Sequence, residues 1–194
     1  MKTLLPALMA PDVNKEYATP KGVELLLHEN RNMRVFWNGK FHYIENLKYP
    51  KGTVVVPVFA NGDVLLVEQV RAPAIGVTWE FPRGGGAEGE STREAAVREV
   101  QEETGYSIRP EDLVYLGKVA PDTATINGTT DVFYVTLPND AVQSAFDTVE
   151  IRRVLRVPRH EFHAHIRASD ILDGITLAAY TYARLHEERH DAPH

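Results

Sequence analysis

The sequence predicts an α+β fold, and three features carry this prediction. Short segments that alternate apolar and polar residues, separated by turns rich in Asn and Gly, indicate strands. Residues 92–104 contain neither Pro nor Gly and place Ala95, Ala96 and Val100 in a narrow apolar stripe, which indicates a helix. A further helical segment closes the chain. Strands that flank one helix and end on another make an α+β sandwich.

The first half of the chain is expected to be mainly strands. Residues 23–45 alternate enough for three short strands, and Asn38-Gly39 lies between two apolar segments, which is a strong indication of a hairpin. Two more strands are expected at 53–59 and 64–70, joined across 61–63.

The second half mixes strands with helices. Alternating patterns predict strands at 113–119, 131–137 and 151–157. Helices are expected at 159–167 and 175–188.

The helix at 92–104 has clear ends. Ser91 with Glu94 three residues later resembles a capping box, and Gly105 is typical of a helix C-terminus. Ahead of the helix, 82–86 (Pro-Arg-Gly-Gly-Gly) predicts a tight loop with few side chains, whose backbone can approach a ligand or metal closely.

Three carboxylates gather on one face of this helix. Glu99 and Glu103 are four residues apart, and Glu102 is three from Glu99. Like charges at this spacing destabilise an isolated helix, so a purely structural role explains them poorly. Mg²⁺ and Mn²⁺ bind several oxygen ligands and keep water or substrate phosphate as the rest. The cluster therefore predicts a site for a hard divalent cation.

These residues resemble the signature of the Nudix hydrolases, G-x5-E-x7-R-E-U-x-E-E-x-G-U, where U is a bulky aliphatic residue. The matching positions are Gly84, Glu90, Arg98, Glu99, Val100, Glu102, Glu103, Gly105 and Tyr106. Tyr106 departs from the pattern because it is aromatic. The resemblance implies the Nudix α/β/α sandwich with a mixed β-sheet for residues 51–194. Residues 1–50 would be an added antiparallel β extension and a possible dimerisation segment.

The resemblance also implies roles for the signature residues. Glu99 and Glu103 would be the main Mg²⁺ ligands, with Mn²⁺ as a possible substitute, and Glu102 and the carbonyl of Arg83 would add ligands. All three glutamates count as catalytic residues. The structural positions would be Gly84, Glu90, Arg98 and Gly105, with an ion pair between Glu90 and Arg98 that joins loop to helix.

Residues before the signature resemble one branch of the family. The segments 68–71 (Glu-Gln-Val-Arg) and 79–82 (Trp-Glu-Phe-Pro) are similar to the E-Q-x-R and W-E-x-P motifs of the ADP-ribose pyrophosphatases, and Pro121 matches a proline that often follows the signature. The branch implies a homodimer that cleaves ADP-ribose to a nucleoside monophosphate and a phosphorylated product. The loop 122–128 lacks the usual Gly-Gly stretch, so other substrates stay open.

The general base is placed by the same resemblance, because the ADP-ribose branch carries a catalytic or metal-binding glutamate on a late loop, which corresponds to residues 145–151 here. Glu150 is the first choice for the base and Asp147 the second, although either could be an exposed loop carboxylate. Arg71, Glu80 and Trp37 are candidate substrate contacts. An ion pair of Arg71 with Glu80 or Glu68, and packing of Trp37 inside the β extension, explain the same residues without a substrate. Asp173 is expected to form a cap or turn.

Composition limits the other functions. The chain has 194 residues, 43% of them hydrophobic, and its net charge of −6 argues against a general nucleic-acid binder. The absence of cysteine fits a reducing cytoplasm. The short apolar run within 1–10 predicts no membrane span, and the histidines show no ligand spacing. The alternatives are a Nudix hydrolase of another nucleotide sugar, dinucleotide, coenzyme or nucleoside triphosphate, and a non-catalytic Nudix-like binding module.

Overall fold

The computed structural model describes residues 24–47, 51–72 and 75–191, which form two sheets and three helices. The first sheet is antiparallel and follows the order β1-β2-β3. Its strands are β1 (Leu25–Glu29), β2 (Met33–Trp37) and β3 (His42–Asn46). The turn between β2 and β3 contains Asn38 and Gly39, and Gly39 has a φ of 89°, as the predicted hairpin requires.

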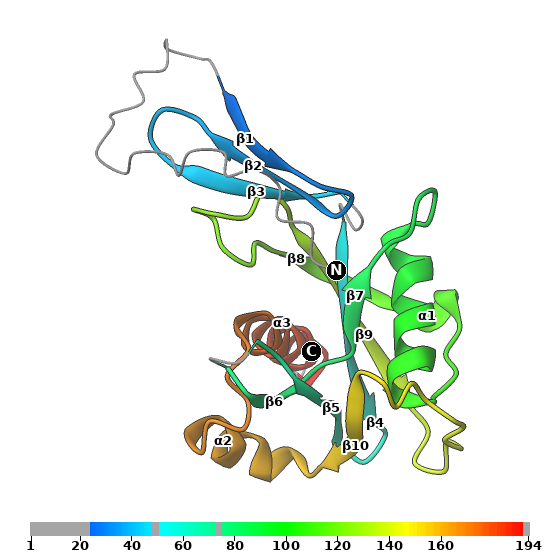
Figure 1. The fold of residues 1–194 in the computed structure, drawn as a ribbon. Coiled ribbons are helices and arrows are strands. Elements are labelled where there is room, and N and C mark those ends of the chain that lie inside the picture. The colour runs from blue at the N-terminus through cyan, green and yellow to red at the C-terminus, as the bar shows by residue number, and fades with distance from the viewer. Residues whose placement is uncertain (1–23, 48–50, 73–74, 192–194) are drawn as a thin grey trace.

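The second sheet is larger and mixed, with the main order β10-β5-β4-β9-β8. Its central strands β4 and β9 run parallel, while the other pairs are antiparallel. The strands are β4 (Gly52–Phe59), β5 (Val64–Val70), β6 (Val77–Glu80), β7 (Arg83–Gly85), β8 (Val114–Val119), β9 (Thr130–Leu137) and β10 (Ile151–Val157). Figure 1 shows the small sheet standing beyond one end of this larger one.

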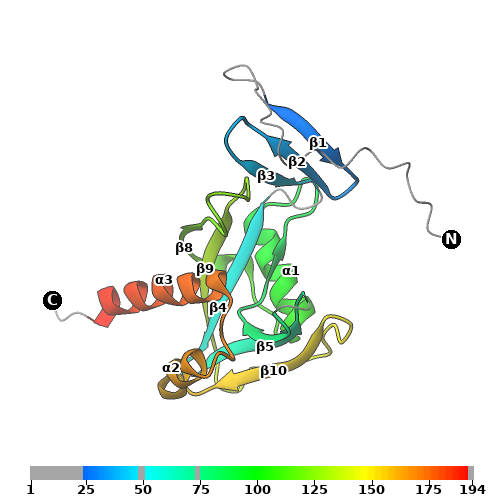
Figure 2. The same ribbon diagram turned by 60° about the vertical axis from the view of Figure 1, so that its left-hand side comes forward.

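The helices lie on both faces of the larger sheet (Figures 1 and 2). They are α1 (Thr92–Thr104), α2 (Arg159–Arg167) and α3 (Gly174–Asp191), with a short 3-10 turn at Pro110–Asp112. Side chains of β4 alternate between two cores. Val54 and Val56 pack with Phe162 of α2 and Ala179 of α3, whereas Val55 packs with residues of α1. The α+β sandwich predicted from the sequence, with its mixed sheet, is thereby confirmed.

The middle of the larger sheet opens where β4 and β5 diverge. These two strands pair only at Val58 and Val64, near the turn that joins them. Further along, β6 pairs with β5 and β7 pairs with β4, so the chain crosses the opening at Phe81 and Pro82. The stretch predicted as a loop is thus partly strand: Arg83–Gly85 pairs with β4, opposite residues 52–54. The pairing fixes the backbone of this glycine-rich stretch at the opening.

The loop between β8 and β9 connects the two sheets. Ile44 of β3 donates its N–H to the carbonyl of Thr125 at 2.8 Å, and the N–H of Asn127 donates to the carbonyl of Ile44 at 2.9 Å. The Asn127 amide also donates to the Glu45 carboxylate at 2.9 Å. The unusual loop identified in the sequence therefore lies along the edge of the first sheet. It forms one wall of a cleft whose other lining residues include those of β7.

The division into a β extension at 1–50 and a Nudix domain at 51–194 stays a prediction, and residues 1–23 and 48–50 lie outside the described part. No helix among the described residues is long and apolar enough to cross a membrane.

Candidate active site

The helix α1 begins and ends as its sequence predicts. Ser91 caps the N-terminus: its hydroxyl accepts the Glu94 N–H at 3.2 Å, and the Glu94 carboxylate accepts the Ser91 N–H at 2.9 Å. Gly105 ends the helix with a φ of 73°, and its N–H donates to the Gln101 carbonyl. Ala96 and Val100 pack on the sheet, and this orientation turns Glu99 and Glu103 toward the opening between β4 and β5.

Glu103 is a nearly buried carboxylate, with 7% of its surface exposed. Its Oε2 accepts the backbone N–H of Arg83 at 3.0 Å, and its Oε1 accepts the Gln69 amide at 3.4 Å. Burial raises the pKa of Glu103 to about 8, and the Arg83 N–H only partly offsets this effect. A carboxylate that binds its proton this tightly when no cation is present is well placed to exchange it for a metal ion.

Glu99 lies against the glycine-rich strand β7. A Cβ added at Gly84 would overlap the Glu99 carboxylate, so only glycine allows this approach of helix to backbone. Burial raises the pKa of Glu99, while the neighbouring Arg98 lowers it. Two carboxylates, each partly desolvated, therefore face the same opening from consecutive turns of α1.

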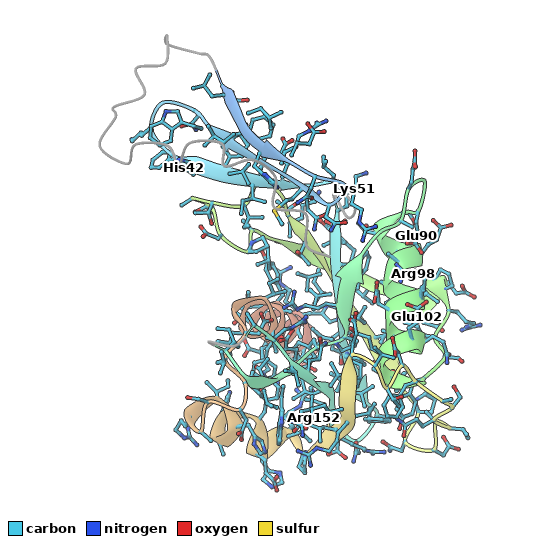
Figure 3. The ribbon with its side chains drawn as sticks, in the orientation of Figure 1. His42, Lys51, Glu90, Arg98, Glu102 and Arg152 are labelled. Carbon is cyan, nitrogen blue, oxygen red and sulfur yellow. The ribbon has the colours of Figure 1, made fainter. Side chains whose placement is uncertain are left out.

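Arg98 links the loop to the helix and holds the remaining carboxylates. Its Nε and Nη2 donate to the two oxygens of Glu90, each at 3.0 Å, and Nη2 also donates to the Gly85 carbonyl at 2.9 Å. Its Nη1 donates to Glu99 at 2.8 Å and to Glu102 at 3.0 Å. Figure 3 shows Glu90, Arg98 and Glu102 following one another beside α1.

The oxygen atoms available at this opening are the type of ligand that a hard divalent cation binds. Glu99 and Glu103 offer carboxylate oxygens at the opening, and the backbone of β7 lies beside them. As the side chains stand, no three acidic or histidine residues of the described chain converge closely enough to hold a metal. Arg98 binds Glu99 and Glu102, and Glu102 keeps 54% of its side chain exposed.

Two arginines line the same opening and share one carboxylate. Arg71 donates from Nε and Nη2 to the two oxygens of Glu80, at 2.8 and 2.6 Å. Arg83 donates from Nε to Glu80 at 2.8 Å and from Nη2 to Asp173 at 3.2 Å. Glu80 is only 1% exposed, and both guanidinium groups add positive potential at Glu103. The sequence left Glu80 and Glu68 open as ion-pair partners of Arg71, and in the structure Arg71 binds Glu80.

Glu68 forms a second charged cluster on β5. Its carboxylate accepts the Trp79 indole N–H at 3.1 Å and the Nε of Arg153 at 3.1 Å. Arg152, labelled in Figure 3, lies 3.9 Å from the same carboxylate. A register shift between Ile151 and Arg153 in β10 puts two consecutive arginines near Glu68.

A cleft of about 290 Å³ begins at β7 and runs toward the first sheet. It is lined by Asn46, Gly52, Thr53, Arg83, Gly84, Gly85, Pro121, Ile126, Asn127, Gly128, Thr129, Thr130 and Ile175. Pro121 and the loop that follows it thus face Arg83 and Gly84 across the cleft, although some 40 residues separate them in sequence. Because Gly84 also contacts the Glu99 carboxylate, the cleft begins beside the acidic face of α1.

The two candidate bases lie on the long loop before β10. This loop contacts the end of α1, because the Asp147 N–H donates to the Glu102 carbonyl at 2.7 Å. The Asp147 side chain accepts the Val149 N–H at 2.7 Å, and Glu150 is exposed in the turn that follows. Trp37 lies in β2 with its ring 4.6 Å from that of His42, and it is not among the residues that line the cleft.

Sequence reasoning missed two contacts at this site. Gln69 touches Glu103 across 34 residues of sequence, and Asp173 binds Arg83 across 90. Gln69 belongs to the E-Q-x-R motif, which could have drawn attention to it. Asp173 accepts the Thr176 N–H at 2.8 Å, as expected of a cap, but its ion pair with Arg83 has no local signal.

Comparison with known proteins agrees with this geometry. A family model described as "NUDIX domain" matches residues 48–174, which is more than half of the chain. The chain therefore belongs to the Nudix family.

Two of its relatives are named as pyrophosphatases of ADP compounds. The ADP-ribose pyrophosphatase of Bacillus subtilis (strain 168) is 26% identical over 154 residues, which cover 77% of this chain and 80% of that protein. The ADP-sugar pyrophosphatase of Mus musculus is 32% identical over 125 residues, 62% of this chain and 56% of that protein. A solved structure of an ADP compounds hydrolase has a TM-score of 0.68 over 87% of this chain and 94% of that one, at 17% identity, and shares its fold. The chain is a Nudix hydrolase that acts on pyrophosphate bonds.

Proposed function

We propose that this protein is a Mg²⁺-dependent pyrophosphohydrolase of nucleoside diphosphates linked to a second group, with an ADP-ribose-like substrate favoured. Its products would be a nucleoside monophosphate and a phosphorylated remainder. The observation that carries the proposal is the pair Glu99 and Glu103, two desolvated carboxylates that face an opening flanked by Arg71 and Arg83. A pyrophosphate needs both cations and positive side chains near it.

The proposed cation ligands are Glu99, Glu103, Glu102 and the carbonyl of Arg83. Bound Mg²⁺, for which Mn²⁺ could substitute, would neutralise the phosphate charge and acidify a water. Glu103 must lose its proton to act as a ligand, and the guanidinium groups of Arg71 and Arg83 lower the cost of its charge. Glu99 and Glu102 must exchange the Arg98 Nη1 for the cation, while Nε and Nη2 of Arg98 can stay on Glu90.

We propose Glu150 as the general base and Asp147 as the alternative. Both lie on the loop that is anchored to α1 through the Asp147 N–H, which donates to the Glu102 carbonyl. A base must reach the attacking water directly or through one further water. Arg71 would contact substrate phosphate, with Glu80 as the acceptor that orients it.

The substrate would extend from the opening into the cleft lined by Pro121 and Asn127. Support for an ADP-linked substrate comes from the names of the two pyrophosphatase relatives, an ADP-ribose and an ADP-sugar enzyme. A contact between Trp37 and substrate would need a second subunit. The homodimer, the use of residues 1–50 to form it, and a cytoplasmic location stay predictions.

A hydrolysis panel with identified products tests the proposal. The purified chain with Mg²⁺ is offered ADP-ribose, a nucleotide sugar, a dinucleotide, a coenzyme and a nucleoside triphosphate, and the products are separated by chromatography. We expect AMP and ribose 5-phosphate from ADP-ribose, and none when EDTA replaces Mg²⁺. Preferential turnover of the triphosphate or dinucleotide would reject the favoured substrate. No turnover of any compound would favour the non-catalytic binding module.

A further inference from the structure

The turn into α3 and the first turn of that helix bind segment 79–83 at every second residue. The Trp79 N–H donates to the Asp170 carbonyl at 2.7 Å, and the Phe81 N–H donates to the Thr176 hydroxyl at 3.1 Å. The Arg83 Nη2 donates to the Asp173 carboxylate at 3.2 Å. The period of two is that of an extended chain, so one face of 79–83 lies along the turn into α3.

Asp173 joins this contact to the helix itself. Its Oδ2 accepts both the N–H and the hydroxyl of Thr176 at 2.8 Å, which is the bond of a helix N-cap. Its other oxygen is thereby turned toward Arg83. Thr176 is 0% exposed, so the cap has a fixed place in the core.

Two of the three nitrogens of the Arg83 guanidinium donate hydrogen bonds to carboxylates. Glu80, itself 1% exposed, accepts Nε, and Asp173 accepts Nη2. Its third nitrogen, Nη1, makes no hydrogen bond or ion pair with any residue that the structure describes. The side chain is 24% exposed and lines the 290 Å³ cleft. A guanidinium fixed in this way offers a preorganised donor to a ligand.

The place of Arg83 also matches a phosphate. Its backbone N–H binds Glu103, one of the proposed cation ligands, and its side chain lies on the cleft side of the same strand. A phosphate that shared a cation with Glu103 would therefore lie beside the Arg83 backbone, from which the guanidinium extends.

We propose that Arg83 binds a phosphate of the substrate through Nη1 and that Asp173 is a positioning residue, which acts by fixing this guanidinium. The inference rests on the proposed function, because it assigns a recognition group within the same site. The alternative is a purely structural network that ties β7 to α3. In that case the two residues would contribute to stability and not to phosphate affinity.

The test is a double-mutant cycle read by calorimetry. Arg83→Gln, Asp173→Asn and the double variant are titrated with α,β-methylene-ADP in Mg²⁺; this probe carries two phosphates whose bridge resists hydrolysis. We expect Arg83→Gln to weaken binding about 10- to 100-fold, the usual range for a charged hydrogen bond to phosphate. Arg83→Lys should recover part of the loss, since it keeps the charge without the fork.

Asp173→Asn keeps the cap oxygen and removes the charge, so we expect it to weaken binding by about 3- to 10-fold. In the Arg83→Gln background it should change affinity by less than about twofold, because it acts through Arg83. Asp170→Asn is the matched control: it lies in the same turn, its side chain pairs with His165, and its carbonyl remains for Trp79. It should bind the probe as the parent does, and thermal unfolding of every variant checks the fold.

Each outcome decides a different point. Unchanged binding by Arg83→Gln, a full Asp173→Asn effect in the double variant, or no binding of the probe by the parent chain overturns the inference. The hydrolysis panel is scored separately on the parent chain. If the parent hydrolyses its substrate while Arg83→Gln binds the probe as tightly, only the inference fails. If the probe binds through Arg83 and no substrate is hydrolysed, only the proposed function fails.

Discussion

Replacing Glu103 by Gln should stabilise the metal-free protein while it removes activity. The native fold keeps Glu103 7% exposed and raises its pKa from 4.5 to about 8. The unfolded chain releases this proton near pH 4.5, so the native state binds more protons than the unfolded state between these values. Glu103 therefore costs no stability below pH 4.5, and the metal-free protein loses stability as the pH rises toward 8.

The size of the effect follows from the two pKa values. At about 1.36 kcal/mol per pKa unit, the cost is about 1 kcal/mol at pH 5, about 3 at pH 7 and close to 5 above pH 9. The glutamine side chain of the variant would be neutral at every pH and could still accept the Arg83 N–H, while the Gln69 amide can turn its oxygen toward the new amide. The variant should therefore lack most of the destabilisation that the ionised Glu103 causes.

Urea unfolding in EDTA at pH 5, 7 and 9 measures the prediction. The difference in unfolding free energy between Glu103→Gln and the parent chain should grow with pH. Glu102→Gln is the control, because its carboxylate is on the same helix but 54% exposed, and it should change stability by less than about 1 kcal/mol at each pH. If Glu103→Gln unfolds at the same urea concentration as the parent at all three pH values, the burial argument for this carboxylate is wrong.

Two further predictions test the surroundings of the cation ligands. Gly84→Ala should reduce the rate of hydrolysis by at least about 100-fold with the fold retained, because the added Cβ would displace the Glu99 carboxylate. Gly174→Ala is the control: its added Cβ meets no atom within 4 Å, so this variant should keep full activity. Glu150→Gln should lower kcat by about 100-fold or more with little change in KM, and Asp147→Asn should retain most activity; the reverse order would assign the base to Asp147.

The fold was predictable from the sequence wherever local patterns decide the structure. The strand at 151–157 and the helix at 159–167 have the bounds that their patterns predict, and α1 has its predicted caps at Ser91 and Gly105. The two short strands β6 and β7 were not predicted. Residues 83–85 contain two glycines and no apolar alternation, and they become a strand only because β4 diverges from β5 and leaves an edge to pair with.

At the candidate site, too, the local contacts were predictable from the sequence and the long-range contacts were not. The acidic face of α1 could be predicted because helix geometry fixes which carboxylates share a face. The contact between Asp173 and Arg83, and the docking of Asn127 on Ile44, join segments that are 90 and about 80 residues apart. Such contacts depend on the path of the chain through the sheet, which the local sequence does not encode. Of the polar network around Glu80, the sequence suggested only the ion pair with Arg71, and the contacts of Arg83 with Glu80 and Asp173 come from the structure.

Titration of the metal-free protein with Mn²⁺ in buffers of different ionisation enthalpy tests the central claim most directly, because it counts the protons released when a cation binds. With a pKa of about 8, Glu103 is mostly protonated at pH 7, so we expect binding to release close to one proton from it, and fewer at pH 9. Glu103→Gln should bind Mn²⁺ far more weakly. Tight binding without proton release at pH 7, or equal binding by Glu103→Gln, would contradict the assignment of this carboxylate as a cation ligand.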